Sequence, residues 1–572
     1  MSTNPYIPQT LQAPIQDQLI LDGKILDSLG KPCTITGGGM AAPILQQYYQ
    51  SLNRVLLNLV GYNIQSTFGA TGNGITDDTN AFAIAIKQVQ SKGGGVIILP
   101  PGTYNITSFA IPYSSAAVTL MGAGDATVIK GYLNAPAGAG RIDVFGSNVT
   151  FLNMLFDGGR TAPVGLAYNR DFLGMGGNDP MANSLTQNTS VWLHGPVNDI
   201  LFQEVNFTHT AGYGILIDAY SGGISSVDIL NCRFNNNYPN TFGLVGGSLV
   251  YGSWTGGIYV NGDGRAANPG RVVSGLYVQG CRFLRNAGNC IWSHLYALDE
   301  LHSDFRFIGN YFQDCGLDGI LYGGVSGGAC VGNVFHRVGY VCTDDTSSPV
   351  PRWLPNLQAT ALDSGGIVKG VLYANNTFTS INGGCIDLDG HGLSVIADNV
   401  MRTPYPDEPE YVEDQIANTG PNNNDPSSYG VNLGSTNQTK YGATDITISG
   451  NTIINLPQGS LKLFAARRVF ATGNNIIAPA NSAYPPIGMG PTGPNPNQRC
   501  YGNRISANNI DYNPAVAAPA IYEDSQFSAF LGSESNAVFG NNPLTPSGTL
   551  AFEFQKAPAS GSVVYLQTVW FS

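Results

Sequence analysis

Two aspartates in the chain lie at a spacing that suits acid–base catalysis. The run "CIDLDGHG" (385–392) places Asp387 and Asp389 two positions apart among apolar residues and glycines. In a β-strand, alternation turns both side chains to one face, with Cβ atoms roughly 6–7 Å apart. Two carboxyl groups so placed can flank a glycosidic bond, one as general acid and the other as base or nucleophile. We therefore take Asp387 and Asp389 as candidate catalytic residues of a glycoside hydrolase.

Comparable runs elsewhere put polar and aromatic residues at matching positions. The runs "GILIDAY", "GIYVNGDG", "IWSH", "GILYGG" and "GVNLG" align with the first when one apolar residue of each faces inward: Ile215, Ile258, Ile291, Ile320, Ile386 and Val431. The next residue, and the one two beyond it, then face outward. Aromatic rings pack on sugar rings, and amides and carboxylates bond sugar hydroxyls. The expected substrate-binding residues on this outer face are Asp218, Tyr259, Asn261, Trp292 and His294.

Other interpretations of these residues stay open. Outward aspartates beside glycine turns also cap turns or keep a surface soluble. Asp299 and Glu300 form a second candidate acid pair. The "DLDG" run could bind a cation, but the sequence offers no identifiable third and fourth ligand. We expect neither a metal nor another cofactor.

The elements that must position these residues repeat along the chain. From residue 148 onward, segments such as "NCRF", "GCRF", "GNYF", "GNVF", "NNTF" and "GNTI" recur, with the shortest gaps near 23 to 29 residues. A strand–turn–strand unit of this period is typical of a solenoid. Asparagine recurs two positions before the last residue of these segments, at Asn310, Asn333, Asn376, Asn399, Asn451, Asn474 and Asn503; Cys232 and Cys281 hold that place earlier. The pattern predicts an all-β solenoid whose turns stack their asparagines.

The first coil of a solenoid has an open strand edge that needs a cover. The stretch "FGATGNGITDDTNAFAIAIKQVQSKGGGVIILPPGTY" (68–104) predicts a helix over 77–91, with Thr76 or Asp77 as its N-cap and Gly93 just past its end. A buried strand follows the helix. We expect this helix to cap the first coil.

Composition excludes several classes of protein. Charged residues make up 11% of the chain and the net charge is −12, so no nucleic-acid partner is expected. No apolar run approaches the length of a membrane span, and the N-terminus "MSTNPYIPQTLQ" lacks the pattern of a signal peptide. Most of the nine cysteines stand in apolar runs. We expect them to be reduced core residues of a chain made in a cytoplasm, without membrane insertion.

The stretch "GATGNGITDDTNAFAIAI" followed by "GGGVIILPPGTY" closely resembles the opening signature of pectate-lyase-like right-handed parallel β-helix proteins. That group includes polysaccharide-degrading enzymes and phage tailspikes. The family usually has aspartate where this chain has Asn73. The resemblance implies a right-handed parallel β-helix, and the repeats extend it to about residue 510. It says less about the reaction, because one fold hosts many activities.

Resemblance to the tailspike group implies a homotrimer that sits in the virion after synthesis in the host cytoplasm. Residues 1–40 would then attach to a phage tail or baseplate protein. The amphipathic run over 41–66 would form a neck helix between subunits, or pack on its own domain instead. The β-helix would span 67–514, and residues 515–572 would form a C-terminal β element that stabilises the trimer. The implied partner is a bacterial surface polysaccharide: capsule, exopolysaccharide or lipopolysaccharide.

His391, inside "GHG", weakly resembles the histidine motif of polygalacturonases, which share this fold. Their companion aspartate pair could be Asp344 and Asp345, but the spacing to His391 is too long by roughly one coil. The polygalacturonase mechanism is therefore not carried over. Asp344 is kept as a third candidate catalytic residue, and His391 as a candidate substrate-binding residue.

Three functions remain open from the sequence. The first is a depolymerase that hydrolyses glycosidic bonds with paired carboxylates. A lyase cutting beside a uronic acid would want a basic residue near the proton removed, and basic residues are nearly absent from the predicted outer face. The third is an adhesin that binds glycan without cutting it. We expect the hydrolase.

Overall fold

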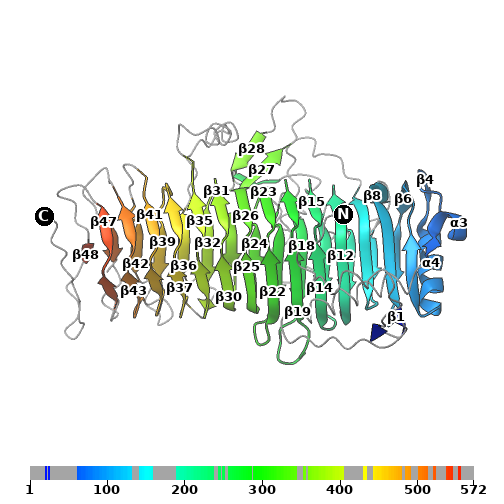
Figure 1. The fold of residues 1–572 in the computed structure, drawn as a ribbon, viewed down its shortest axis with the longest axis horizontal. Helices are drawn as coiled ribbons and strands as arrows, with labels where there is room; N and C mark the ends of the chain where they lie inside the picture. Colours follow the sequence, from blue (N-terminus) through cyan, green and yellow to red (C-terminus); the bar gives the residue numbers. More distant parts are fainter. Residues whose placement is uncertain are drawn as a thin grey trace.

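The molecule is an elongated stack of parallel β-strands with two short helices at one end and the last strands at the other (Figure 1). Each coil of the chain contributes strands to three faces, so the fold is a parallel β-helix, as the sequence predicts. The computed structural model describes residues 20–21, 24–25, 61–131, 141–158, 189–210, 212–237, 243–245, 248–250, 256–286, 288–343, 352–355, 359–404, 429–434, 442–479, 484–490, 500–512, 520–523, 536–544 and 552–554.

One face of the stack carries the predicted site and is called the site sheet below. It is a parallel sheet of fourteen strands, each paired with the strand of the next coil. In order along the stack these are β7 (Ser108–Ile111), β9 (Arg141–Val144), β11 (Val191–His194), β13 (Tyr213–Asp218), β18 (Gly256–Gly262), β21 (Ile291–Leu295), β24 (Ile320–Tyr322), β29 (Thr360–Ser364), β32 (Gly384–Asp389), β36 (Tyr429–Gly434), β39 (Leu461–Phe464), β42 (Ile487–Gly490), β45 (Ile521–Glu523) and β48 (Phe552–Phe554).

The chain leaves each site strand for a second face and reaches a third face after the asparagine turn. The second face holds β3 (Tyr62–Asn63), β5 (Gly94–Ile98), β14 (Ile224–Leu230), β19 (Val273–Gln279), β22 (His302–Ile308), β25 (Val325–Val331), β30 (Val368–Ala374), β33 (His391–Gly392), β34 (Val395–Ala397), β37 (Thr447–Ser449), β40 (Phe470–Thr472), β43 (Arg504–Ser506) and β46 (Ala537–Phe539). The long strands β8 (Ala117–Gly131), β10 (Val149–Asp157) and β12 (Val197–Thr208) run through both faces. The third face adds β4 (Asn73–Asp77), β6 (Gly102–Ile106), β15 (Arg233–Asn235), β20 (Arg282–Leu284), β23 (Tyr311–Cys315), β26 (Val334–Val338), β31 (Thr377–Thr379), β35 (Val400–Arg402), β38 (Thr452–Ile454), β41 (Asn475–Ile477), β44 (Asn509–Asp511) and β47 (Asn542–Leu544).

The core explains why the repeated segments so often end in phenylalanine. The rings stack coil on coil with neighbouring centroids 4.6–5.1 Å apart and planes within 6° of parallel, through Phe156, Phe207, Phe234, Phe283, Phe312, Phe335 and Phe378. This spacing is the distance between paired strands, about 4.8 Å. Each ring therefore packs on its equivalent in the next coil and holds the register of the stack.

Asparagines form the predicted ladder at the turn between the second and third faces. At each step one side-chain oxygen accepts the backbone N–H of the preceding asparagine, as in Asn310 to Asn333 at 2.9 Å and Asn376 to Asn399 at 2.9 Å. The backbone N–H of Cys281 bonds Asn310 in the same way, which confirms the place assigned to that cysteine. Asn503 does not join this ladder.

The ladder continues from Asn474 to Asn508 and then to Asn541. The backbone N–H of Asn503 instead bonds the Asn536 side chain, outside this ladder. The prediction chose Asn503 in that coil, whereas the ladder uses Asn508.

The first coil is capped as predicted, although the helix boundary differs. Helix α4 spans Thr79–Ser91 and buries Phe82, which packs against Phe109 of β7. Its N-cap is Asp78, not Thr76 or Asp77, and the Asp78 carboxylate accepts backbone N–H groups of the preceding loop instead of the helix. Helix α3 (Ile64–Phe68) lies beside it at the same end (Figure 1).

The β-helix extends further at both ends than the boundaries 67 and 514. Strand β3, which begins at Tyr62, pairs with β5, and strands β45 to β48 continue the stack to Phe554. Of the neck helix expected over 41–66, residues 41–60 lie outside the described residues, while 62–66 form β3 and the start of α3. Three antiparallel pairs also occur: β1 (Ile20–Leu21) with β2 (Lys24–Ile25), β16 (Gly243–Val245) with β17 (Ser248–Val250), and β27 (Tyr340–Thr343) with β28 (Arg352–Pro355). No helix in the described part of the chain is long and apolar enough to cross a membrane.

The asparagine ladder can be tested with two adjacent residues. Asn474 is fully buried and bonds Asn451, Asn508 and the Ile448 carbonyl, whereas Asn475 is exposed on β41. Asn474→Ala leaves several buried groups unpaired and should lower stability by on the order of 3 kcal/mol, against less than about 0.5 kcal/mol for Asn475→Ala. Urea unfolding of both variants measures this. Equal shifts of the two midpoints would show that the ladder contributes nothing particular.

Candidate functional site

Strand pairing in the site sheet confirms the alignment of its inward residues. Ile215 pairs with Ile258, Ile258 with Ile291 and Ile291 with Ile320, and further along Ile386 pairs with Val431. The residues that follow them form one outward column, Asp143, Trp192, Leu216, Tyr259, Trp292, Leu321, Asp363, Asp387, Asn432 and Lys462.

The sequence alignment skipped one coil. Leu362 of β29 pairs with both Ile320 and Ile386, so this strand stands between them, and its outward residue is Asp363. The sequence alignment passed directly from Ile320 to Ile386 and assigned no strand over 343–366. The pattern "ALDSGG", an aspartate after an apolar residue and before glycines, was the signal that could have separated β29 from the loop.

Four carboxyl groups come together around β29 and β32. Asp363 and Asp387 are directly paired on neighbouring strands, which lie about 4.8 Å apart, and Asp389 follows two residues along β32. Asp318, just before β24, is 7% exposed, and one of its oxygens accepts the backbone N–H of Thr360 at 2.7 Å. Besides burial, neighbouring carboxyls of this cluster raise the pKa values of Asp318, Asp363 and Asp389.

Asp387 is the anchored member of this acidic cluster. One carboxylate oxygen accepts the hydroxyl of Tyr429, and the other accepts the side-chain N–H of Asn432 at 2.9 Å. The ammonium of Lys462 lies 4.5 Å from the centre of the Tyr429 ring. Burial, the largest influence, leaves the pKa of Asp387 above its usual value, and these two donors and the charge of Lys462 oppose that rise. The neighbours thus favour ionised Asp387.

The other three carboxyls hold their protons more tightly. Burial and the charge of Asp387 raise the pKa of Asp389 to about 7. Burial likewise raises the pKa of Asp318 to about 7, and that of Asp363 well above its usual value with help from the neighbouring aspartates. When the surroundings push the pKa values of two neighbouring carboxyls apart, the one with the higher pKa can act as the acid and the other as the base. Asp389 is suited to be the acid, and Asp387 the base or nucleophile.

The predicted binding residues lie on the outward side as expected, but most are covered. Tyr259 is 2% exposed, Asn261 4% and Asp218 6%. Asp218 accepts the Asn261 side-chain N–H at 3.2 Å, and burial raises its pKa. Trp292 and His294 are half-buried, and burial lowers the pKa of His294. Trp292 and His294 therefore offer more surface to a ligand than the other three.

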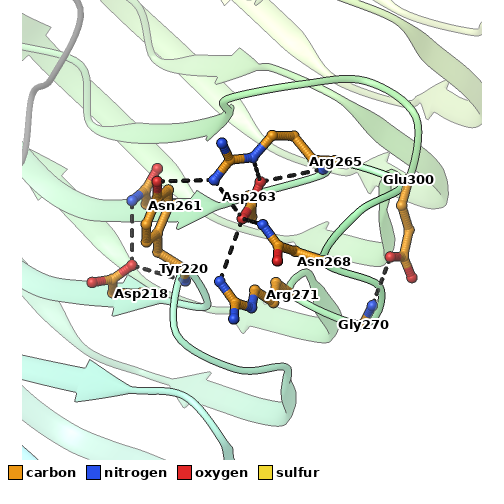
Figure 2. A network of polar contacts seen from close by, with 9 residues as sticks. All are labelled: Asp218, Tyr220, Asn261, Asp263, Arg265, Asn268, Gly270, Arg271 and Glu300. Carbon is orange, nitrogen blue, oxygen red and sulfur yellow. Dashed lines mark hydrogen bonds and ion pairs between the residues drawn. The ribbon is translucent and has the colours of Figure 1, made fainter.

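A second polar cluster holds the turn that follows β18 (Figure 2). Asp263 is fully buried; it accepts N–H groups from Arg265 and from Asn268 at 2.7 Å, and Arg271 lies 3.6 Å away. Hydrogen bonds from Arg265, the largest influence, lower the pKa of Asp263. Arg265 also donates to the Tyr220 hydroxyl at 3.1 Å. This network fixes the turn beside Asn261 and Asp218, as Figure 2 shows.

The second candidate acid pair supports the same turn. The carboxylate of Asp299 accepts the backbone N–H of Ala266 at 3.0 Å, and that of Glu300 accepts the backbone N–H of Gly270 at 2.7 Å. Both side chains bond backbone, so the contacts here are those of loop support and not of a paired acid and base.

The remaining predicted site residues do not join the acidic cluster in the described structure. Asp344 and Asp345 lie outside the described residues. His391 lies in β33, whose backbone pairs with Val368 of β30 on the second face, so it belongs to the face next to the site sheet. The prediction extended the site strand past its end at Asp389. Across the described residues, no three Asp, Glu, His or Cys side chains are grouped to hold a metal ion.

Residues 61–291 match the family described as rhamnogalacturonase A/epimerase, pectate lyase-like. The pectate-lyase-like resemblance is confirmed. The match includes the capped first coils and reaches β21, and the structure continues the same coils beyond it.

The individual proteins that this chain resembles include an epimerase, a surface adhesin and a tailspike protein. Mannuronan C5-epimerase AlgE2 of Azotobacter vinelandii is 25% identical over 272 residues, which are 45% of this chain and 25% of that protein. This chain spans a quarter or less of the length of the first curated relatives it matches. PfbA, a surface adhesin of Streptococcus pneumoniae, has a TM-score of 0.48 and 15% identity, covering 72% of this chain and 89% of its own. The Dettilon tailspike protein has a TM-score of 0.37 and 14% identity, covering 85% and 67%.

The acidic cluster should make stability depend on pH. Asp318 has a folded pKa of about 7, above the unfolded value, so the folded state binds its proton more tightly and the unfolding free energy falls as pH rises from about 4 to about 7. Asp318→Asn keeps the acceptor for Thr360 without the charge, and should stabilise the protein at pH 8 by on the order of 1–3 kcal/mol.

Urea midpoints at pH 5 and pH 8 measure this effect. Asp304→Asn, on the second face, is the matched control, because Asp304 is exposed and pairs with Arg306. If Asp318→Asn shifted the midpoint equally at both pH values, proton binding at Asp318 would not be the cause.

Proposed function

We propose that the chain is a polysaccharide depolymerase that hydrolyses glycosidic bonds on the outer face of the site sheet. The observation that carries the proposal is the acidic cluster, in which an anchored carboxylate, Asp387, stands beside a carboxyl of raised pKa, Asp389. The pectate-lyase-like match of residues 61–291 supports a carbohydrate-active enzyme. The choice of hydrolysis rests on the cluster alone.

In this mechanism, protonated Asp389 gives its proton to the oxygen of the leaving sugar. Ionised Asp387 either attacks the sugar carbon or activates a water molecule, depending on the separation between the two carboxyls in the complex. Asp363, held neutral by burial and by its neighbours, donates a hydrogen bond to a sugar hydroxyl without adding charge. Tyr429 and Asn432 keep Asp387 in place while the proton moves.

Lys462 is the observation that favours a second candidate, cleavage by β-elimination. The sequence predicted almost no base on this column, but Lys462 pairs with Asn432 there, and burial lowers its pKa. A lysine of lowered pKa could remove a proton beside a uronic acid. Hydrolysis remains our preference because the Asp387 carboxylate faces this ammonium and favours its charged form. Tyr429 is no alternative base, since burial and Asp387 raise its pKa.

Within this function, we place the protein in the phage tailspike group, with a bacterial surface polysaccharide as substrate. That assignment, the homotrimer and the attachment to the virion stay predictions from the sequence resemblance.

The reaction can be identified from its products on a panel of bacterial surface polysaccharides. Hydrolysis yields new reducing ends without ultraviolet absorbance from unsaturated uronate. We expect Asp387→Asn and Asp389→Asn each to lower the rate by at least about 10²-fold, because each removes an acid or base from the reaction. Asp304→Asn is the control and should retain full activity. Ultraviolet-absorbing product, lost in Lys462→Met, would instead establish the elimination reaction.

The pH–rate profile tests the division of roles. Activity should fall as pH rises through about 7, when Asp389 loses the proton that it must donate. Tyr429→Phe removes one donor from Asp387, so the pKa of that carboxylate rises and the acidic limb of kcat/KM moves to higher pH. Tyr113→Phe, at an exposed ring, serves as the control. A profile whose acidic limb does not move in Tyr429→Phe would remove Asp387 from the role of base.

A further inference from the structure

The cations of the site sheet are already matched to carboxylates. Within the described part of the chain, its strands and the turn over 263–271 carry Arg141, Arg265, Arg271 and Lys462 as their cationic residues. The Arg141 guanidinium lies 3.0 Å from one Asp143 oxygen, and the Nε2 atom of His194 lies 2.8 Å from the same oxygen.

Arg265, Arg271 and Lys462 also face carboxylates. Arg265 and Arg271 both face the buried carboxylate of Asp263, so one aspartate takes up two guanidinium groups (Figure 2). Lys462 faces Asp387 and the ring of Tyr429. His294, half-buried on this sheet, is held neutral by burial. Asp263 is shared by Arg265 and Arg271, and the carboxylates of Asp299 and Glu300 bond the backbone of the same turn, so each cation here lies among carboxylates.

A sugar carboxylate brought onto this face would be poorly compensated. A charged group loses hydration when it enters a half-buried site and needs a cation or several N–H donors in return. Here it would meet Asp387 and, above about pH 7, ionised Asp389, and the net charge of −12 of the whole chain adds a repulsive field at longer range.

Uncharged sugars meet no such cost. Trp292 is half-buried on the outward column and can pack against a sugar ring, and neutral Asp363 can bond sugar hydroxyls. Trp292 is three strands from Asp387, or about 14 Å, so a short oligosaccharide could reach from the ring to the acidic cluster.

We propose that the site sheet takes a neutral glycan, and that it excludes polyuronates through the carboxyl groups of Asp387 and Asp389 and through the lack of a cation without a carboxylate partner. This inference rests on the proposed function for the location of the site. It sets the chain apart in substrate charge from the mannuronan epimerase that it resembles.

Binding, measured apart from cleavage, tests this inference. Asp387→Asn, which we expect to be inactive, is assayed against mannuronan and polygalacturonate, against each polymer after reduction of its carboxyl groups, and against neutral and uronate-containing bacterial surface polysaccharides. The tightest ligand should contain no uronate. Each carboxyl-reduced polymer should bind at least about tenfold tighter than its parent, because the linkages are unchanged and the charge is gone.

Two further measurements isolate the charge. Screening weakens repulsion, so any binding of a polyuronate should strengthen between about 0.01 M and about 0.15 M salt. At pH 8, where Asp389 is ionised, adding Asp389→Asn to the inactive variant should raise polyuronate affinity by roughly 3- to 30-fold and leave the reduced polymer unaffected. Adding Asp304→Asn on the second face changes net charge equally and should alter neither.

The outcomes separate the two proposals. Selective binding of neutral glycan without cleavage by the wild type would support the substrate class and remove the hydrolase. A polyuronate that binds most tightly, and less tightly as salt is added, would overturn the neutral-glycan inference while leaving a depolymerase possible. Absence of binding to every member of the panel would overturn both.

Discussion

In-register pairing of successive coils is the constraint on which the rest of this structure depends. Parallel strands of neighbouring coils lie about 4.8 Å apart, so every residue has its equivalent directly above and below it. The phenylalanine stack and the asparagine ladder both use this spacing, and both would be lost if one coil slipped by one residue. The same slip would turn Asp387 and Asp389 into the core. Register therefore sets stability and site geometry together.

The acidic cluster works against the stability that this stacking provides. Asp363 and Asp387 are adjacent because their strands are paired, and neither can move apart without breaking the sheet. Their repulsion and burial raise the pKa values of the cluster, and a charged form is tolerated chiefly at Asp387, where Tyr429 and Asn432 donate hydrogen bonds. A rigid stack can hold such an unfavourable arrangement because many coils contribute to its stability, and an unfavourable arrangement of carboxyls is what acid–base chemistry needs.

The site sheet also divides its polar groups between two tasks. Around Asp263 they satisfy one another, with a buried carboxylate facing two guanidinium groups and fixing a turn (Figure 2). Around Asp389 the carboxyl groups have raised pKa values and face one another instead of cations. The first arrangement is suited to holding a loop, and the second to exchanging a proton with a ligand. Asp299 and Glu300, though adjacent in sequence, belong to the first arrangement, because both bond the backbone of the turn that Asp263 holds.

The sequence by itself determined the fold, the capped first coil, the inward register and the outward Asp387 and Asp389. These follow from local patterns: a period of about one coil, alternation along a strand, and recurring asparagine turns. Only the tertiary structure decided that Asp363 joins Asp387 and Asp389, because the long connection after β27 hid strand β29 in the sequence. It also brought Asp318, Tyr429 and Lys462 to these aspartates from three other coils. It also decided that Tyr259 and Asn261 are buried although they face outward. Alternation gives the direction of a side chain, whereas its neighbours across coils and its exposure depend on where distant segments of the chain pack.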